Sequence, residues 1–281
     1  MFVFNHAFSD FVAASRFIRT FIRSYVQKSS APSVKDTYID YLRELEALWN
    51  VAPGPAASWW QRRPWDEVTE LPGVQSLDSS GNADVTRRTT VLLANEHASQ
   101  ALNEASVIRA LERSIREECE IDLIRIDSAV HGRDNRVRRA AAGWVSHALP
   151  YIFHPHLTCK DIFETKAAAS AWPSAFHRVR NRTDITLQQK ISGHAFVNFF
   201  GSFDPRSWTA EGFTASRVQP IYHAPGRATL TPIHLKIRRN AEQWVLSWSI
   251  TNRFSDEAVP ERIVANVQRL LADDHALDVA A

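Results

Sequence analysis

Four short segments combine side chains that could do chemistry with glycine or small residues at chain turns. In chain order they are residues 5–11 (NHAFSDF), 129–133 (AVHGR), 143–150 (GWVSHALP) and 197–204 (VNFFGSFD). The first contains His6, whose imidazole suits proton transfer because its unperturbed pKa lies near neutral pH. No segment is specific by itself, since short glycine-containing matches arise by chance. Their order along the chain is the stronger signal.

The other reactive side-chain types have simpler explanations. Ser146 and Ser202 lack the Gly-x-Ser-x-Gly context of an esterase nucleophile. His154 and His156 alternate along a chain segment, and two histidines without a third ligand bind zinc poorly. We therefore predict no metal site.

Composition excludes several classes of protein. The chain has 281 residues, is 44% hydrophobic and 23% charged, and carries a net charge of +2 from 33 basic and 31 acidic residues. This balance argues against a nucleic-acid partner, and no apolar run approaches the length of a membrane span. We expect no signal peptide, because the first residues show neither a basic region nor a sustained apolar run, and two cysteines cannot form a disulfide framework. We expect a cytoplasmic protein with no membrane partner.

Hydrophobic periodicity predicts a mixture of helices and strands. Residues 51–85 are rich in proline, glycine and serine, and we predict a long loop pinned by Trp59, Trp60 and Trp65. Helices are expected at residues 11–26, 36–49, 100–118, 161–171 and 260–272. Strands are expected at residues 1–4, 89–94, 121–130, 194–200 and 218–223. A further strand should end at residues 151–153, and residues 234–238 and 244–251 should form a hairpin. The fold class is α/β, of the mixed α+β kind.

In order and approximate spacing, the four segments resemble motifs of nonribosomal peptide synthetase condensation and epimerization domains. Those motifs are HHxxxDG, EGHGR, VGWFTxxxP and FNYLGxFD, and the resemblance runs from Met1 to about Asp274. It implies a two-lobed fold like that of chloramphenicol acetyltransferase, with the first lobe largely missing. Residues 1–50 would end the N-terminal lobe, 51–85 would be the crossover loop, and 86–281 would form the C-terminal lobe. A truncated sequence, one half of a split enzyme or a relic would each explain the missing lobe.

The resemblance also implies roles for individual residues. His6 would be the catalytic acid or base, or would position the attacking amine. Asp10 would pair with Arg133 and hold the site together, although Asp10 could also serve as a helix N-cap. Four further residues would line the substrate tunnel: Asn5, Ala129, His131 and Asn198.

Three positions depart from the family pattern. Asn5 replaces the first motif histidine, and Phe11 replaces the motif glycine. The glutamate with which epimerization domains move the Cα proton aligns with Ala129, which cannot carry a proton. Asp127 lies two residues earlier and shares the strand face of Ala129, so it is either a displaced carboxylate or an ordinary surface aspartate.

The resemblance implies work on aminoacyl or peptidyl thioesters held by a carrier protein. The reaction would be amide bond formation or Cα epimerization, with no directly bound cofactor beyond the phosphopantetheine arm of the carrier. The expected partners are a peptidyl or acyl carrier protein and a separate chain that could supply the N-terminal lobe. The alternative is a non-catalytic, degenerate remnant that binds carrier protein as a scaffold.

Overall fold

The structure is a computed structural model of the chain. It describes residues 11–30, 37–50, 58, 60, 62–75, 86–94, 102–133, 145–154, 162–167, 193–202, 231–239 and 243–272. The strands predicted at residues 1–4 and 218–223, and Trp59, lie outside these ranges.

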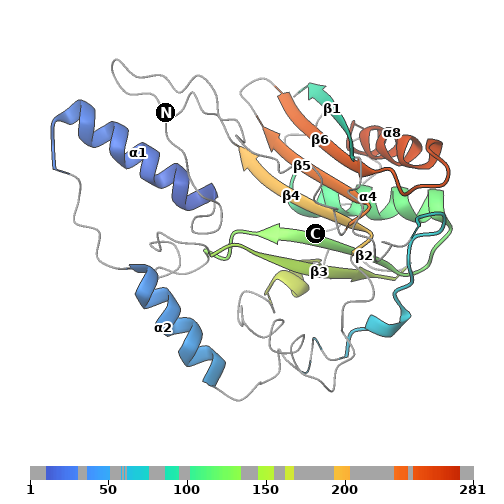
Figure 1. The fold of residues 1–281 in the computed structure, drawn as a ribbon, viewed down its shortest axis with the longest axis horizontal. Coiled ribbons are helices and arrows are strands. Elements are labelled where there is room, and N and C mark those ends of the chain that lie inside the picture. Colours follow the sequence, from blue (N-terminus) through green and yellow to red (C-terminus); the bar gives the residue numbers. More distant parts are fainter. Residues whose placement is uncertain are drawn as a thin grey trace.

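Among the described residues, six strands form one mixed sheet in the order β1-β6-β5-β4-β2-β3 (Figure 1). The pairs β2–β4 and β4–β5 are parallel, and the pairs β1–β6, β5–β6 and β2–β3 are antiparallel. The strands are β1 (Thr86–Ala94), β2 (Ile124–Val130), β3 (His147–Phe153), β4 (Ala195–Ser202), β5 (Ile233–Arg239) and β6 (Gln243–Thr251). The predicted mixed α/β class and the predicted hairpin of the last two strands are confirmed.

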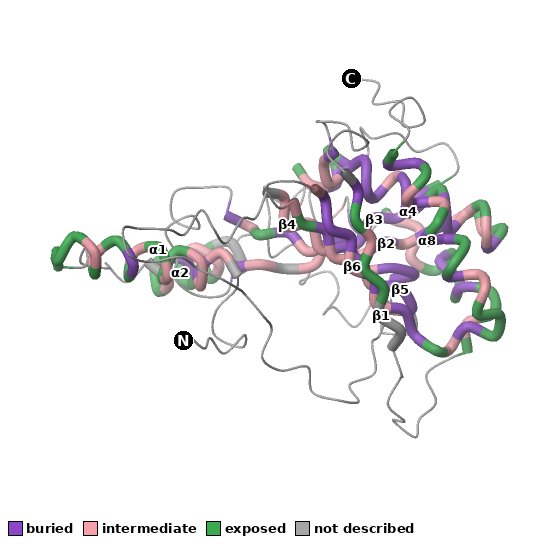
Figure 2. The backbone as a smooth tube through the Cα atoms, turned by 90° about the horizontal axis from the view of Figure 1, so that it is seen from above, coloured by how far each residue is buried: buried purple, intermediate pink, exposed green. Residues whose placement is uncertain are grey.

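The two faces of the sheet differ in burial because side chains alternate along each strand. In β2, Ile124 and Ile126 are fully buried on one face, whereas Asp127 and Ala129 are half-buried on the other. The helices α4 (Glu104–Cys119) and α8 (Ala258–Ala272) lie side by side against the buried face (Figure 2). We call the opposite face, which carries Asp127, Ala129 and Asn198, the polar face.

Helix α4 forms much of the core beneath the sheet. Its apolar stripe buries Ile108, Leu111 and Ile115 completely, and each such burial contributes about 1.5–3 kcal/mol. Asn103 and Ser106 form a capping box, in which each side chain accepts a 3.0 Å hydrogen bond from the other residue's backbone N–H. This cap makes the helix begin at Glu104, four residues later than predicted.

Helix α8 begins two residues before the predicted Pro260. The backbone N–H of Ala258 donates a 2.9 Å hydrogen bond to Asp256 Oδ1, which satisfies a donor at the start of the helix. Proline is tolerated in a first turn because its position there requires no N–H. The proline therefore lies inside the helix, in its first turn.

Helices α1 (Phe11–Gln27) and α2 (Thr37–Asn50) lie apart from the α4–α8 layer, toward the end of the sheet where β2 and β4 finish (Figure 1). Tyr41 of α2 packs on Val145, just before β3. Both helices agree with the sequence prediction to within a residue. Both helices therefore lie near the ends of β2 and β4 (Figure 1).

Of the three tryptophans predicted to pin residues 51–85, the structure describes Trp60 and Trp65, and both pack against the core. Trp60 is fully buried and stacks on Trp65, whose Nε1–H donates a 2.7 Å hydrogen bond to the Trp60 carbonyl. The Arg125 guanidinium lies 5.7 Å from the centre of the Trp65 ring. Further along, His194 Nε2 lies 2.6 Å from the Thr69 carbonyl, and His194 Nδ1 accepts from the Arg125 N–H at 3.2 Å. Because Nδ1 accepts a hydrogen bond, the His194 imidazole is neutral with its proton on Nε2, which donates to Thr69, and burial lowers the pKa of His194 in the same sense.

Candidate active site

Two predicted site residues meet through the parallel pairing of β2 with β4. The register places Ala129 directly beside Asn198, and both are half-buried on the polar face. Because paired residues of neighbouring strands point to the same face, the methyl group and the amide line one surface. The sequence predicted both residues, and the structure brings them together.

The segment after β2 turns sharply at Gly132, whose φ of +60° is favoured by glycine. The backbone N–H of Arg133 donates a 2.9 Å hydrogen bond to His131 Nδ1 across this turn. One nitrogen of His131 is therefore committed to shaping the turn. Nε2 is the nitrogen of His131 that this hydrogen bond does not use, and His131 is exposed.

Arg133 is only 4% exposed. A guanidinium at such depth is stable only with hydrogen-bonding or ionic partners, because an uncompensated buried charge is costly. Asp10, the predicted partner of Arg133, lies outside the described residues, as do Asn5 and His6. The Asp10–Arg133 pair and the role of His6 therefore stay predictions.

Asp127 lies on the same face as Ala129, but its carboxylate is held by Arg125. Arg125 Nε donates to Oδ1 at 2.8 Å and Nη2 donates to Oδ2 at 3.0 Å. Gly193 also approaches closely, since a Cβ at that position would lie 2.9 Å from Asp127 Cγ. The carboxylate would have to leave this ion pair to move a proton, so its catalytic role remains a prediction.

Sequence reasoning missed two residues of the polar face, His234 and Lys236 in β5. Burial, and then the charge of Lys236, lowers the pKa of His234 to about 4. The His234 ring meets Phe196 edge-on, with ring centres 4.9 Å apart. The alternating pattern of IHLKIRR could have placed both residues on one face, but the strand register decides that Lys236 lies beside Asn198 and His234 beside Phe196.

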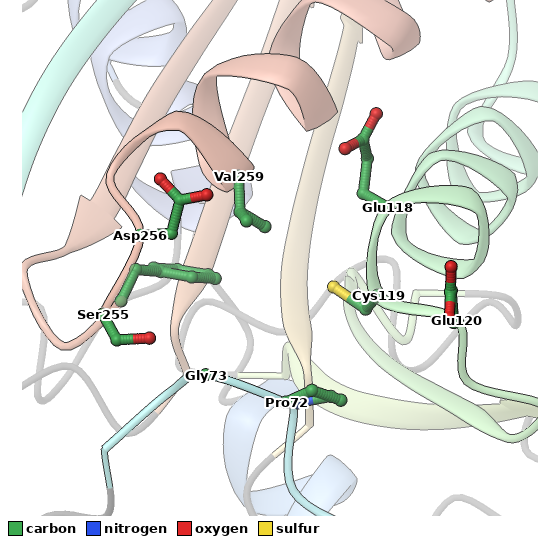
Figure 3. A pocket seen from close by; sticks show the side chains of 9 residues that line it. Pro72, Gly73, Glu118, Cys119, Glu120, Ser255, Asp256 and Val259 are labelled. Atoms are coloured by element: carbon green, nitrogen blue, oxygen red, sulfur yellow. The ribbon is translucent and has the colours of Figure 1, made fainter.

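A pocket of about 300 Å³ lies at the opposite end of the sheet from Arg133. Its lining residues are Pro72, Gly73, Glu118, Cys119, Glu120, Phe254, Ser255, Asp256 and Val259. The sulfur of Cys119 points into the pocket (Figure 3). Burial raises the pKa of the Cys119 thiol to about 11, which makes it a poor nucleophile. The nearby Glu118 carboxylate binds Arg262 at 2.6 Å and Asn266 at 3.0 Å. None of the predicted site residues that the structure describes lines this pocket.

The described ranges contain neither a metal-binding cluster nor a membrane-spanning helix. No group of three or more histidine, cysteine or acidic side chains there could hold a metal ion. His154 is exposed, and His156 lies outside the described residues. None of the described helices combines the length and the apolar character needed to cross a membrane.

Comparison with solved structures identifies the architecture. The epimerization domain from the third module of tyrocidine synthetase B matches 95% of this chain, with a TM-score of 0.67 and 14% identity. The condensation domain of the monacolin K polyketide synthase also matches 95%, with a TM-score of 0.68 and 14% identity. The chain has the condensation-domain fold. The PapA2 acyl transferase is similar as well, over 95% of this chain, with a TM-score of 0.68 and 12% identity.

The condensation-domain fold is represented only in part. The chain spans 66%, 67% and 64% of the lengths of these three structures, so about a third of each has no counterpart here. No protein-family model matches the sequence, and no curated protein matches it. At 12–14% identity the likeness establishes the fold alone.

Proposed function

We propose that the chain forms the C-terminal part of a condensation- or epimerization-type catalyst for thioesters bound to a carrier protein. The observation that carries the proposal is the condensation-domain fold. In it, the pairing of β2 with β4 places Ala129 beside Asn198, and the segment after β2 leads to buried Arg133. The carrier's phosphopantetheine arm delivers an aminoacyl or peptidyl thioester to this end of the sheet. Additional polypeptide supplies the rest of the two-lobed fold, either in the same chain or as a separate partner.

Within the proposal, the residues of the polar face favour amide bond formation over epimerization. Epimerization removes a Cα proton on one face and returns a proton on the other, which requires two acid–base groups. Ala129 cannot carry a proton, and the Asp127 carboxylate is engaged by Arg125. In amide bond formation, His6 alone accepts the proton of the attacking amine while the C–S bond breaks and the thiolate leaves.

The test follows two reactions of one substrate. An aminoacyl thioester on a carrier protein is incubated in D₂O with the protein completed by its N-terminal lobe, with and without an acceptor aminoacyl carrier. A dipeptide product without deuterium at Cα is expected, and His6→Ala should abolish it while carrier binding survives. His154→Ala removes an exposed histidine and is the matched control. Dipeptide formation that persists in His6→Ala would refute the role of His6, and deuterium uptake at Cα would identify an epimerase.

The second candidate is a non-catalytic scaffold that binds carrier protein. Ala129 supports it, because the position at which family members carry a proton-transferring glutamate has only a methyl group. This alternative predicts that the carrier protein binds with the same affinity to the parent and to His6→Ala. Carrier binding without either product or deuterium uptake would establish it in place of the catalyst.

A further inference from the structure

The pocket beside Cys119 has no part in the proposed reaction. Its volume of about 300 Å³ is at the lower end of the range for small-molecule sites. The end of α4, the start of α8 and the turn at Pro72 and Gly73 surround it (Figure 3). The pocket lies at the opposite end of the sheet from Arg133, so a ligand bound there would not occupy the polar face.

The wall of the pocket carries a surplus of negative charge. Three of its lining residues, Glu118, Glu120 and Asp256, are acidic, and none is basic. Arg262 lies outside the lining, but its guanidinium lies 2.6 Å from Glu118 and 3.7 Å from Asp256. Three carboxylates and this one guanidinium leave a net charge of −2. The Glu120 carboxylate has no hydrogen bond or ion pair within the described part of the chain, so it is available to a ligand.

The thiol of Cys119 is a second, independent indication of a ligand. The side chain is only 8% exposed, and its sulfur points into the pocket (Figure 3). Cys119 forms no disulfide, and the described residues provide no hydrogen-bond partner for its thiol. Burial, followed by the charge of Glu118, raises the pKa of this thiol to about 11, so the group is neutral at physiological pH. A bound molecule would supply the contact that the chain itself does not make.

The rest of the wall is apolar. Phe254, Val259 and Pro72 line the pocket, and Phe254 is only 6% exposed. Apolar side chains next to carboxylates suit a molecule with an alkyl body and a cationic head, and an aromatic ring also attracts cations. The wall would repel an anion. Within the described ranges no three ligating side chains come together for a metal ion.

We propose that this pocket binds a small primary alkylammonium ion. The ammonium group lies at the acidic wall near Glu120, and the alkyl chain lies against Cys119, Phe254 and Val259. Since one water molecule occupies about 30 Å³, the pocket accommodates a ligand of roughly five to ten non-hydrogen atoms. This second site does not depend on the proposed function.

The test compares three probes that share a pentyl chain and differ in charge. Pentylammonium, 1-pentanol and hexanoate are positive, neutral and negative at pH 7.5. Binding to the ¹⁵N-labelled full chain is followed by the backbone amide shifts of residues 118–120 and 254–259. We expect pentylammonium to bind about three- to tenfold more tightly than 1-pentanol, as for an ion pair at a partly exposed site, and hexanoate to bind most weakly.

Charge-removing variants then locate the source of the preference. Glu120→Gln should reduce the preference for pentylammonium, and Glu120→Gln combined with Asp256→Asn should abolish it, while 1-pentanol binds as before. The side-chain oxygen introduced by Asp256→Asn can still accept the hydrogen bond from the Ala258 N–H at the start of α8. Glu46→Gln removes an exposed carboxylate from α2 and is the matched control.

Two pocket-filling variants show whether the probes bind inside the pocket. Cys119→Leu and Val259→Phe enlarge side chains of different walls, so each should weaken the binding of pentylammonium and of 1-pentanol. Two variants are used so that a folding defect in one does not decide the result.

Several outcomes would overturn the proposal. Equal affinity for pentylammonium and 1-pentanol, or a preference that survives the double charge variant, would show that the acidic wall does not select the ligand. Unchanged binding in both pocket-filling variants, or the absence of shifts at residues 118–120 and 254–259 with all three probes, would show that the pocket is not a binding site. Each of these outcomes leaves the proposed function standing.

Discussion

Acidification should destabilise this protein through His234. The pKa of His234 is about 4 in the folded chain and 6.5 in an unfolded one, mainly because burial disfavours the charged imidazole. As the pH falls, the His234 imidazole is therefore protonated in the unfolded chain before it is protonated in the folded chain. The contribution of His234 to the free energy of unfolding is complete above pH 6.5 and is lost as the pH falls toward 4. Because one pKa unit corresponds to about 1.36 kcal/mol, the difference between 6.5 and about 4 contributes at most about 3.4 kcal/mol to the free energy of unfolding. About 2.5 kcal/mol of this contribution is lost by about pH 4.5.

The assay is urea unfolding followed by tryptophan fluorescence at several pH values from 7.5 to 4.5. His234→Gln, which does not titrate, should lose about 2.5 kcal/mol less free energy of unfolding over this range than the parent. His154→Gln replaces an exposed histidine and should follow the parent. An identical pH dependence in His234→Gln and the parent would refute the reasoning, because the depressed pKa would then contribute nothing to stability.

Three further predictions concern contacts at single residues. Asn103→Ala removes the capping box of α4 and should lower the free energy of unfolding by about 1 kcal/mol; an unchanged urea midpoint would show that the cap is not needed. Gly193→Ala places a Cβ 2.9 Å from Asp127 Cγ and should cost about 1–3 kcal/mol by overpacking. Adding Asp127→Ala should relieve this clash, so the double variant should lose less free energy of unfolding than the sum of the two single variants; losses that simply add would contradict the overpacking. Cys159 is the other cysteine of the chain, so alkylation of Cys119 is measured in the Cys159→Ser variant. Iodoacetamide should alkylate Cys119 slowly at pH 8 and much faster near pH 11; rapid alkylation at pH 8 would contradict the raised pKa.

The local elements were predictable from the sequence because their signals are local. The apolar periodicity of residues 11–26 predicted α1, and alternation on both sides of residue 240 predicted the β5–β6 hairpin. The ends of the elements were less predictable. The start of α4, for example, depends on the hydrogen bonds that the side chains of Asn103 and Ser106 accept from each other's backbone N–H groups.

The sheet order could not be predicted because it depends on contacts between distant segments. Nothing in β2 alone indicates that it pairs with β4 as well as with β3, the next strand along the chain. The same limit applies to the site, where Ala129 and Asn198 were predicted from motif resemblance but Lys236 was missed. Lys236 joins them only through the register of β4 with β5.

The position of β1 at one edge of the sheet has a consequence during synthesis. Its Leu93 pairs with Trp244 of β6, so 244 − 93 = 151 residues separate the partners in the chain. At roughly 5–20 residues per second, a ribosome needs about 8–30 s between making the two strands. Throughout that interval β1 has no strand to bind within this sheet, and its unpaired backbone is open to pairing with other chains. Of the strands described, β1 is thus the one for which protection by a chaperone during translation would matter most.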